Sequence, residues 1–127
     1  MKCLFRVPTF PLICDVSGVL IAAETPEQFD DAISTLSLPA GEELPVIDGS
    51  AEGWVFHVDY MVMSPMTIKK RWTKKEIIAL YNNSDAAKRS GVEYSTKSLS
   101  AKRIDRIIAE VAALVRASTS GTVEGDK

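Results

Sequence analysis

The only histidine of the chain, His57, is the side chain best suited to proton transfer near neutral pH. It lies in Trp54–Met63, the longest β-like run, and strand alternation places Asp59 on the same face two residues later. A carboxylate beside an imidazole can orient it as a general base. Cys14 is the one thiol that strand pairing could bring near, but its apolar neighbours indicate an inert buried side chain. His57 and Asp59 therefore support only the last-ranked of three function hypotheses, an enzyme, and no catalytic residue is assigned.

The sharpest local signal is a basic run around one tryptophan, with no acidic residue before Glu76. Lys74 and Lys75 fall in the first turn of an expected helix, where the positive end of the helix dipole disfavours cations. Residues that oppose local stability tend to mark binding sites, and this combination suits a phosphate, a carboxylate or a stacked base. The alternative is a solvated loop with Trp72 packed in the core. The candidate binding residues are Lys69, Lys70, Arg71, Trp72, Lys74 and Lys75.

Charge is distributed unevenly along the chain. Residues 1–68 carry two basic and ten acidic residues, whereas residues 69–127 carry thirteen basic and seven acidic ones. A basic half can bind an anionic partner, but the two halves can equally fold against each other or pair in a homo-oligomer. Nucleic-acid binding requires the basic side chains to form one continuous patch. Beyond the basic run, that patch would include Lys88, Arg89, Lys97, Lys102 and Arg106.

The composition excludes several classes of protein. The chain has 127 residues, 46% of them hydrophobic and 25% charged, which is typical of one globular domain. No apolar run reaches the roughly 18 residues that a membrane span requires. One histidine and two cysteines eleven residues apart match no zinc spacing, and no glycine-rich phosphate loop is present. We therefore expect no metal, no cofactor and no membrane, and a cytoplasmic protein whose Cys3 and Cys14 are thiols.

The segment Asp85–Thr96 resembles the helix-turn-helix of bacterial lac-type repressors, through Ala87, Gly91 and Val92. It covers about a tenth of the chain. In that family the motif would direct Tyr94, Ser95 and Thr96 toward DNA. The sequence departs from the family pattern at three positions where the motif packs apolar residues, which here hold Asn83, Lys97 and Ser100. We therefore assign no family.

Two similar ββα-like units account for the first two thirds of the chain. In the first, Asp15–Gly18 is a turn between strands, and Thr25 caps a helix to about Leu36 with Gln28 closing a capping box. In the second, residues 44–47 and Trp54–Met63 are strands around a turn. Thr73 and Glu76 then form a capping box for a helix that ends at residues 82–83. We expect both hairpins to join one sheet, because neither buries its apolar face alone.

The last third is predicted to be helical. A short helix ends at Gly91, and an amphipathic helix over Leu99–Arg116 should cover the apolar side of the sheet. Residues 117–127 are expected to form a flexible polar tail beyond a single domain of residues 1–116. The predicted fold is α+β: a mainly antiparallel sheet of four to five strands, with helices mostly on one face.

The leading function hypothesis is a small, non-enzymatic cytoplasmic interaction protein that acts through protein–protein contacts. It ranks first because no catalytic constellation stands out, and its partner is an unidentified protein or a second copy of the chain. The alternative is binding of nucleic acid or another anion through the basic run and the basic C-terminal helices.

Overall fold

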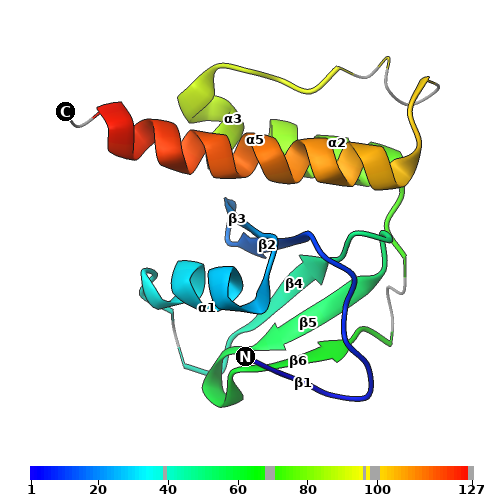
Figure 1. The fold of residues 1–127 in the computed structure, drawn as a ribbon, viewed down its shortest axis with the longest axis vertical. Coiled ribbons are helices and arrows are strands. Elements are labelled where there is room, and N and C mark those ends of the chain that lie inside the picture. Colours follow the sequence, from blue (N-terminus) through cyan, green and yellow to red (C-terminus); the bar gives the residue numbers. More distant parts are fainter. Residues whose placement is uncertain (39, 68–70, 96, 98–100, 126–127) are drawn as a thin grey trace.

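The computed structural model describes residues 1–38, 40–67, 71–95, 97 and 101–125. Its fold is α+β, as the sequence predicts, but the sheet has six strands rather than four to five (Figure 1). Their order is β1-β6-β5-β4-β2-β3, and the sheet is mixed because β1 runs parallel to β6. The strands are β1 Lys2–Cys3, β2 Leu12–Val16, β3 Val19–Ala23, β4 Glu43–Ile47, β5 Gly53–His57 and β6 Val62–Pro65. The helices are α1 Pro26–Ser34, α2 Lys74–Asn82, α3 Asp85–Ser90 and α5 Ile104–Gly125.

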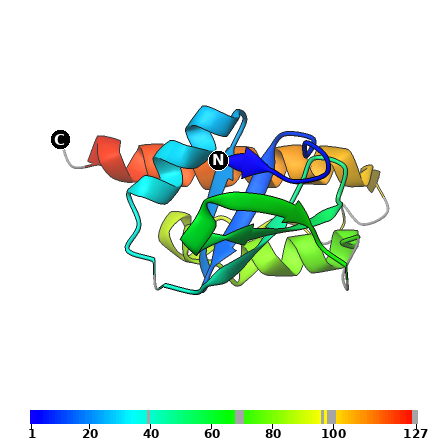
Figure 2. The ribbon, with the colours of Figure 1, turned by 90° about the horizontal axis from the view of Figure 1, so that it is seen from below.

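Helices cover both faces of the β2–β3 hairpin. In Figure 1, α2, α3 and α5 form a layer above the hairpin and α1 lies below it; Figure 2 gives the view from below, with α1 in front of α5. Alternation along β2 explains this arrangement, since successive side chains enter opposite cores. Ile13 packs with α2, α3 and α5, whereas Leu12 and Cys14 pack with α1.

The β2–β3 hairpin forms as predicted. Its two-residue loop, Ser17 and Gly18, has φ values of 53° and 90°, the left-handed pair that a type I′ turn requires. Asp15 Oδ1 accepts a hydrogen bond of 2.8 Å from the Gly18 amide. This turn matches the natural twist of the strands and fixes Val16 opposite Val19.

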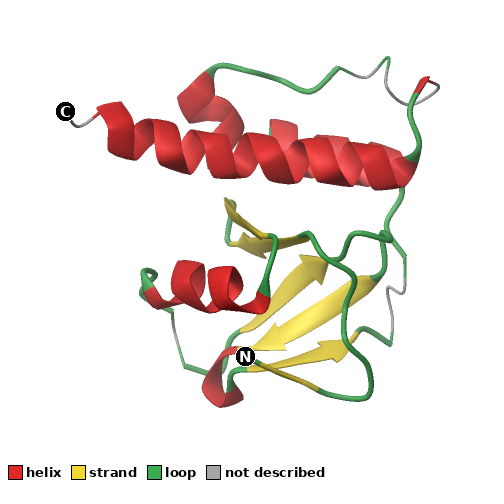
Figure 3. Ribbon diagram, viewed as in Figure 1, coloured by secondary structure: helices red, strands yellow, loops and turns green. Residues whose placement is uncertain are grey.

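The prediction of one long strand over Trp54–Met63 is wrong. Strand β5 ends at His57, a 3-10 turn (η1, Val58–Tyr60) follows, and Met61 adopts a left-handed conformation with φ 52° before β6 begins. The two halves of the run fold back and pair antiparallel, with His57 opposite Val62 (Figure 3). Alternation therefore stops at residue 57. Tyr60, which continued alternation would place on the same face as the buried Trp54, is 80% exposed.

The helix caps follow the sequence closely. Thr73 and Glu76 form the predicted capping box at the start of α2. Thr25 Oγ1 caps α1 by accepting from the Gln28 amide, but Gln28 Oε1 accepts from the amide of Glu24, not from that of Thr25. The capping box expected there is thus replaced by a bond one residue earlier. Ser84 caps the start of α3, and Gly91, which has φ 70°, ends the helix as expected.

The C-terminal helix differs from its prediction at both ends. It begins at Ile104, not at Leu99, which lies outside the described residues, as do Ser98 and Ser100. Its backbone remains helical through Gly125. The backbone of residues 117–125, which were predicted to belong to a flexible polar tail, is helical, and residues 126–127 are not described.

Candidate functional site

The basic run is only partly described, because Lys69 and Lys70 lie outside the described residues. Arg71 forms an isolated antiparallel β-bridge with Glu52, the residue before β5, and its guanidinium donates to the Ser50 carbonyl at 3.3 Å. The Trp72 amide donates to the Ala51 carbonyl at 2.8 Å, and its half-buried ring packs against the core beneath α2 and α5. Trp72 is thus packed against the core, as in the alternative interpretation of the basic run, in which Trp72 does not stack on a base.

Lys74 and Lys75 occupy the first turn of α2, as predicted, with Lys75 exposed. Elsewhere, several basic side chains pair with acidic ones instead of extending a patch. Arg89 lies 3.3 Å from Asp85, and Glu110 receives both Lys102 at 2.6 Å and Arg106 at 3.0 Å. This alternation of charge counts against one continuous cationic surface.

The predicted His57–Asp59 pair is not formed. Asp59 lies in the η1 turn and accepts a hydrogen bond of 2.7 Å from the Gly41 amide. The imidazole of His57 instead lies 3.1 Å from Glu43 Oε2 through Nδ1 and 2.9 Å from Ser64 Oγ through Nε2. Cys14 is fully buried, and burial raises the pKa of its thiol, so it is unsuited to act as a nucleophile.

Ser64, His57 and Glu43 are connected by hydrogen bonds in the sequence serine–histidine–carboxylate, as in the catalytic triads of acyl-transfer enzymes. All three side chains line a surface hollow of about 650 Å³. Two features separate the arrangement from a catalytic triad. The Glu43 side chain is 65% exposed, so water competes for the imidazole. Ser64 lies within β6 opposite Val55, and its amide belongs to the sheet ladder, unlike the free amide of an oxyanion hole. We therefore assign His57 no catalytic role.

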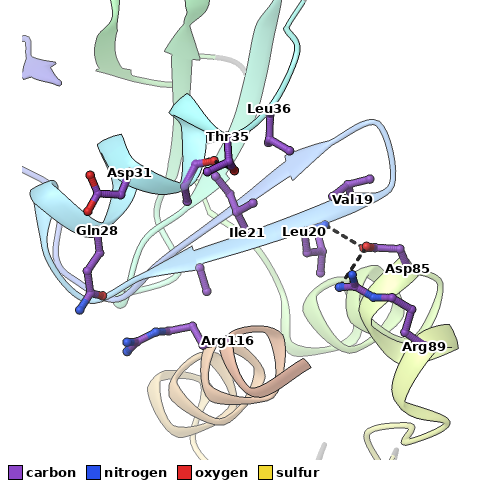
Figure 4. A pocket seen from close by; sticks show the side chains of 12 residues that line it. Val19, Leu20, Ile21, Gln28, Asp31, Thr35, Leu36, Asp85, Arg89 and Arg116 are labelled. Atoms are coloured by element: carbon purple, nitrogen blue, oxygen red, sulfur yellow. Dashed lines mark hydrogen bonds and ion pairs between the residues drawn. The ribbon is translucent and has the colours of Figure 1, made fainter. Parts of the chain in front are cut away.

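A different feature stands out at the opposite end of the sheet. Strand β3 pairs with β2 alone and is the edge of the sheet. It forms the floor of a groove of about 470 Å³ between α1 on one side and α3 and α5 on the other (Figure 4). The floor consists of Val19, Leu20, Ile21 and Ala22. The walls are Gln28, Asp31, Ala32, Thr35 and Leu36 on the α1 side, and Asp85, Arg89 and Arg116 on the other.

The backbone of β3 offers hydrogen bonds toward this groove. Leu20 and Ala22 occupy alternate positions whose amides and carbonyls point away from β2, as the Leu20 amide shows by donating to Asp85 Oδ1 at 3.1 Å. Within the described part of the chain, the Ala22 amide and the carbonyls of Leu20 and Ala22 have no hydrogen-bond partner. Helix α3 thus occupies the strand edge at the Leu20 amide, whereas the edge remains open for hydrogen bonding from the Leu20 carbonyl to Ala22.

The groove has two chemically different walls. Ala32 and Leu36 present aliphatic groups on the α1 side, beside Val19 and Ile21. On the other side Arg89 and Arg116 reach the rim with their guanidinium groups, from α3 and α5 respectively (Figure 4). Arg116 also lies 3.8 Å from Glu24. Sequence reasoning missed this site because hydrophobic pattern identifies a strand without showing whether it lies at an edge.

Among the described residues, no group of three or more His, Cys, Asp or Glu side chains is placed to hold a metal ion. No helix in the described ranges combines the length and apolarity needed to cross a bilayer.

Comparison with models of known protein families, with curated proteins and with solved structures gave no significant match to this chain.

Proposed function

We propose that this chain is a small, non-enzymatic interaction protein that binds an extended segment of a partner protein along strand β3. The observation that carries the proposal is the open strand edge at the floor of the groove. An extended chain placed there would continue the sheet, donating to the Ala22 carbonyl and accepting from the Ala22 amide. The side chains of the added strand would contact α1 on one face of the sheet and α3 and α5 on the other.

The flanking helices favour a single segment over a second copy of the chain. In each copy, β3 lies between α1 and the α3–α5 layer. Two such recessed edges would bring their flanking helices into collision before the strands reached pairing distance, about 4.8 Å. A lone extended segment meets no such obstacle.

The cytoplasmic location belongs to the same proposal. Cys3 and Cys14 lie in different strands and are both free thiols. A protein with unpaired thiols, one of them in its core, is compatible with a reducing compartment.

Selection of binders from a library of displayed random peptides tests the proposal. The matched variant is Ala22→Pro, which removes the amide that points into the groove but no hydrogen bond to β2. We expect peptides that bind the wild-type chain and are not retained by the variant. A second variant, Ala32→Arg, fills the groove from α1 and should have the same effect if Ala22→Pro perturbs folding. Failure to select any peptide, or binding by both variants that is as tight as binding by the wild-type chain, would overturn the proposal.

Binding of a nucleic acid or another anion is the second candidate, supported by the basic residues at the start of α2. Because Arg89, Lys102 and Arg106 pair with carboxylates, this candidate depends on Arg71, Lys74 and Lys75. Fluorescence anisotropy with labelled DNA and RNA at several salt concentrations tests it. Binding whose logarithm falls linearly with the logarithm of salt concentration, with a smaller slope for Lys74→Ala/Lys75→Ala, would favour this function. Absence of binding at low salt would exclude it.

A further inference from the structure

We infer that the segment bound along β3 alternates apolar and acidic residues; this inference rests on the function proposed above. In an added strand, successive side chains point to opposite faces of the sheet. One set would face Ala32 and Leu36 on the α1 wall, which also carries Gln28, Asp31 and Thr35. The other set would face the wall that carries Asp85, Arg89 and Arg116. A ligand that suits both walls therefore alternates two kinds of side chain, one for each wall.

The register follows from the open backbone groups. A ligand residue opposite Ala22 can form both hydrogen bonds of an antiparallel pair, and its side chain lies on the same face as that of Ala22. Ala22 packs with the cluster beneath α5, so this ligand side chain points toward the wall of Arg116. Two residues further along the ligand, the next side chain on that face lies opposite Leu20, where Asp85 and its ion-pair partner Arg89 are both found. The residue between them faces Ile21 and the α1 wall.

Charge determines which polar residue occupies that face. Both arginines are partly exposed, and a guanidinium has five N–H donors, so their contacts with Asp85 and Glu24 leave donors for a ligand carboxylate. The α1 wall holds an acidic group of its own, Asp31, which disfavours a uniformly acidic ligand. Glutamate or aspartate on one face and valine, isoleucine or leucine on the other satisfy both walls.

Asp85 limits the length of the paired segment. Its carboxylate already accepts from the Leu20 amide, and its own amide donates to the Gly18 carbonyl at 3.1 Å. The ligand ladder therefore ends opposite Leu20, where the C-terminal part of an antiparallel ligand lies. A core of four residues, apolar-acidic-apolar-acidic in the ligand's own direction, is enough to occupy the open edge.

Three labelled peptides of equal length distinguish this inference from general peptide binding, with affinity measured by fluorescence anisotropy. One has a Val-Glu-Val-Glu core, one has Val-Lys-Val-Lys, and one has the same composition as the first in blocks, Val-Val-Glu-Glu. We expect the first to bind at least about tenfold more tightly than the other two, because only it places both carboxylates beside arginines.

Charge reversal in the protein supplies the matched test. Arg89→Glu/Arg116→Glu should weaken binding of Val-Glu-Val-Glu by at least about tenfold and strengthen binding of Val-Lys-Val-Lys. The control, Arg103→Glu, makes the same kind of charge change at an exposed position outside the groove and should leave both affinities unchanged. Equal affinity for the alternating and block peptides, or no effect of the double reversal, overturns the inference. If the display library yields groove-dependent peptides of another pattern, the proposed function stands and only this specificity is wrong.

Discussion

Asp85 Oδ1 lies 3.1 Å from the amide of Leu20 and accepts its hydrogen bond, joining the first turn of α3 to the edge of the sheet. The Asp85 amide returns a bond of 3.1 Å to the Gly18 carbonyl. One residue thus substitutes for a neighbouring strand over the first part of β3. Exposed edges invite uncontrolled pairing, and closing part of the edge with a helix reduces that hazard. The remaining open part, at Ala22, is short and lies between helices.

Replacing Asp85 tests this connection. Asp85→Ala should lower the free energy of unfolding by about 1–2 kcal/mol, because the half-buried Leu20 amide loses its acceptor. The ion pair with Arg89 contributes little to that figure, since exposed i,i+4 pairs stabilise by about 0.3–0.5 kcal/mol. Urea denaturation followed by tryptophan fluorescence measures the change, with Asp105→Ala at the start of α5 as control. Equal stabilities of the two variants would show that the contact with β3 is unimportant.

The carboxylate of Asp48 organises the turn between β4 and β5, and the side chain is 1% exposed. It accepts hydrogen bonds from the amides of Thr9, Ser50 and Glu52, from the Ser50 hydroxyl and from Trp54 Nε1, all between 2.7 and 3.1 Å. Asp48→Asn places an amide donor against these donors, so we expect a loss of about 2–4 kcal/mol in unfolding free energy.

The matched control for Asp48→Asn is Asp59→Asn, where an exposed carboxylate accepts from one backbone amide, that of Gly41. That change should cost about 1 kcal/mol or less. Chemical denaturation of both variants gives the comparison, and near-ultraviolet circular dichroism reports on the Trp54 environment. A cost for Asp48→Asn no greater than the control would contradict a central structural role.

Glu110 predicts a specific dependence of stability on pH. Its hydrogen bonds with Lys102, Tyr94 and Arg106 lower the pKa of the carboxyl from its usual value of 4.5 to about 2. Because the pKa in the folded chain is below that in the unfolded chain, the stabilisation is fully present above pH 4.5 and is lost as the pH falls toward 2. Glu110→Gln should therefore unfold at lower urea concentration than the wild type at pH 7.

The difference between wild type and Glu110→Gln should shrink as the pH falls below 4.5 and vanish near pH 2, in a series of urea titrations. Asp31→Asn serves as a control for general acid effects, because that exposed carboxylate has no ion pair in the described part of the chain. A gap between wild type and Glu110→Gln that is independent of pH would show that the hydrogen bonds do not act through ionisation.

Local chemistry predicted much of the fold. The hairpin with its turn at Asp15–Gly18, the capping box of Thr73 and Glu76 and the end of α3 at Gly91 each depend on a few adjacent residues, and all three are confirmed. The parallel pairing of β1 with β6 and the edge position of β3 depend on contacts between distant segments, which periodicity does not encode. The candidate site was missed for the same reason, because its floor and walls come from four separate elements.

The failed prediction over Trp54–Met63 has a local cause, and it can be tested. Met61 lies at φ 52° and ψ 47°, a left-handed conformation that costs an ordinary side chain about 1–2 kcal/mol. No glycine or asparagine marks this turn, so the sequence looks like one continuous strand.

The Met61 side chain is 39% exposed and loses little packing when removed. Met61→Gly should therefore raise the free energy of unfolding by about 0.5–1 kcal/mol, after allowance for the greater freedom of glycine in the unfolded chain. The control is Met66→Gly, the same change at a half-buried position that does not have positive φ, which should destabilise the protein. Thermal and urea denaturation of both variants decide the matter, and a destabilising Met61→Gly would show that packing of the side chain outweighs the backbone conformation.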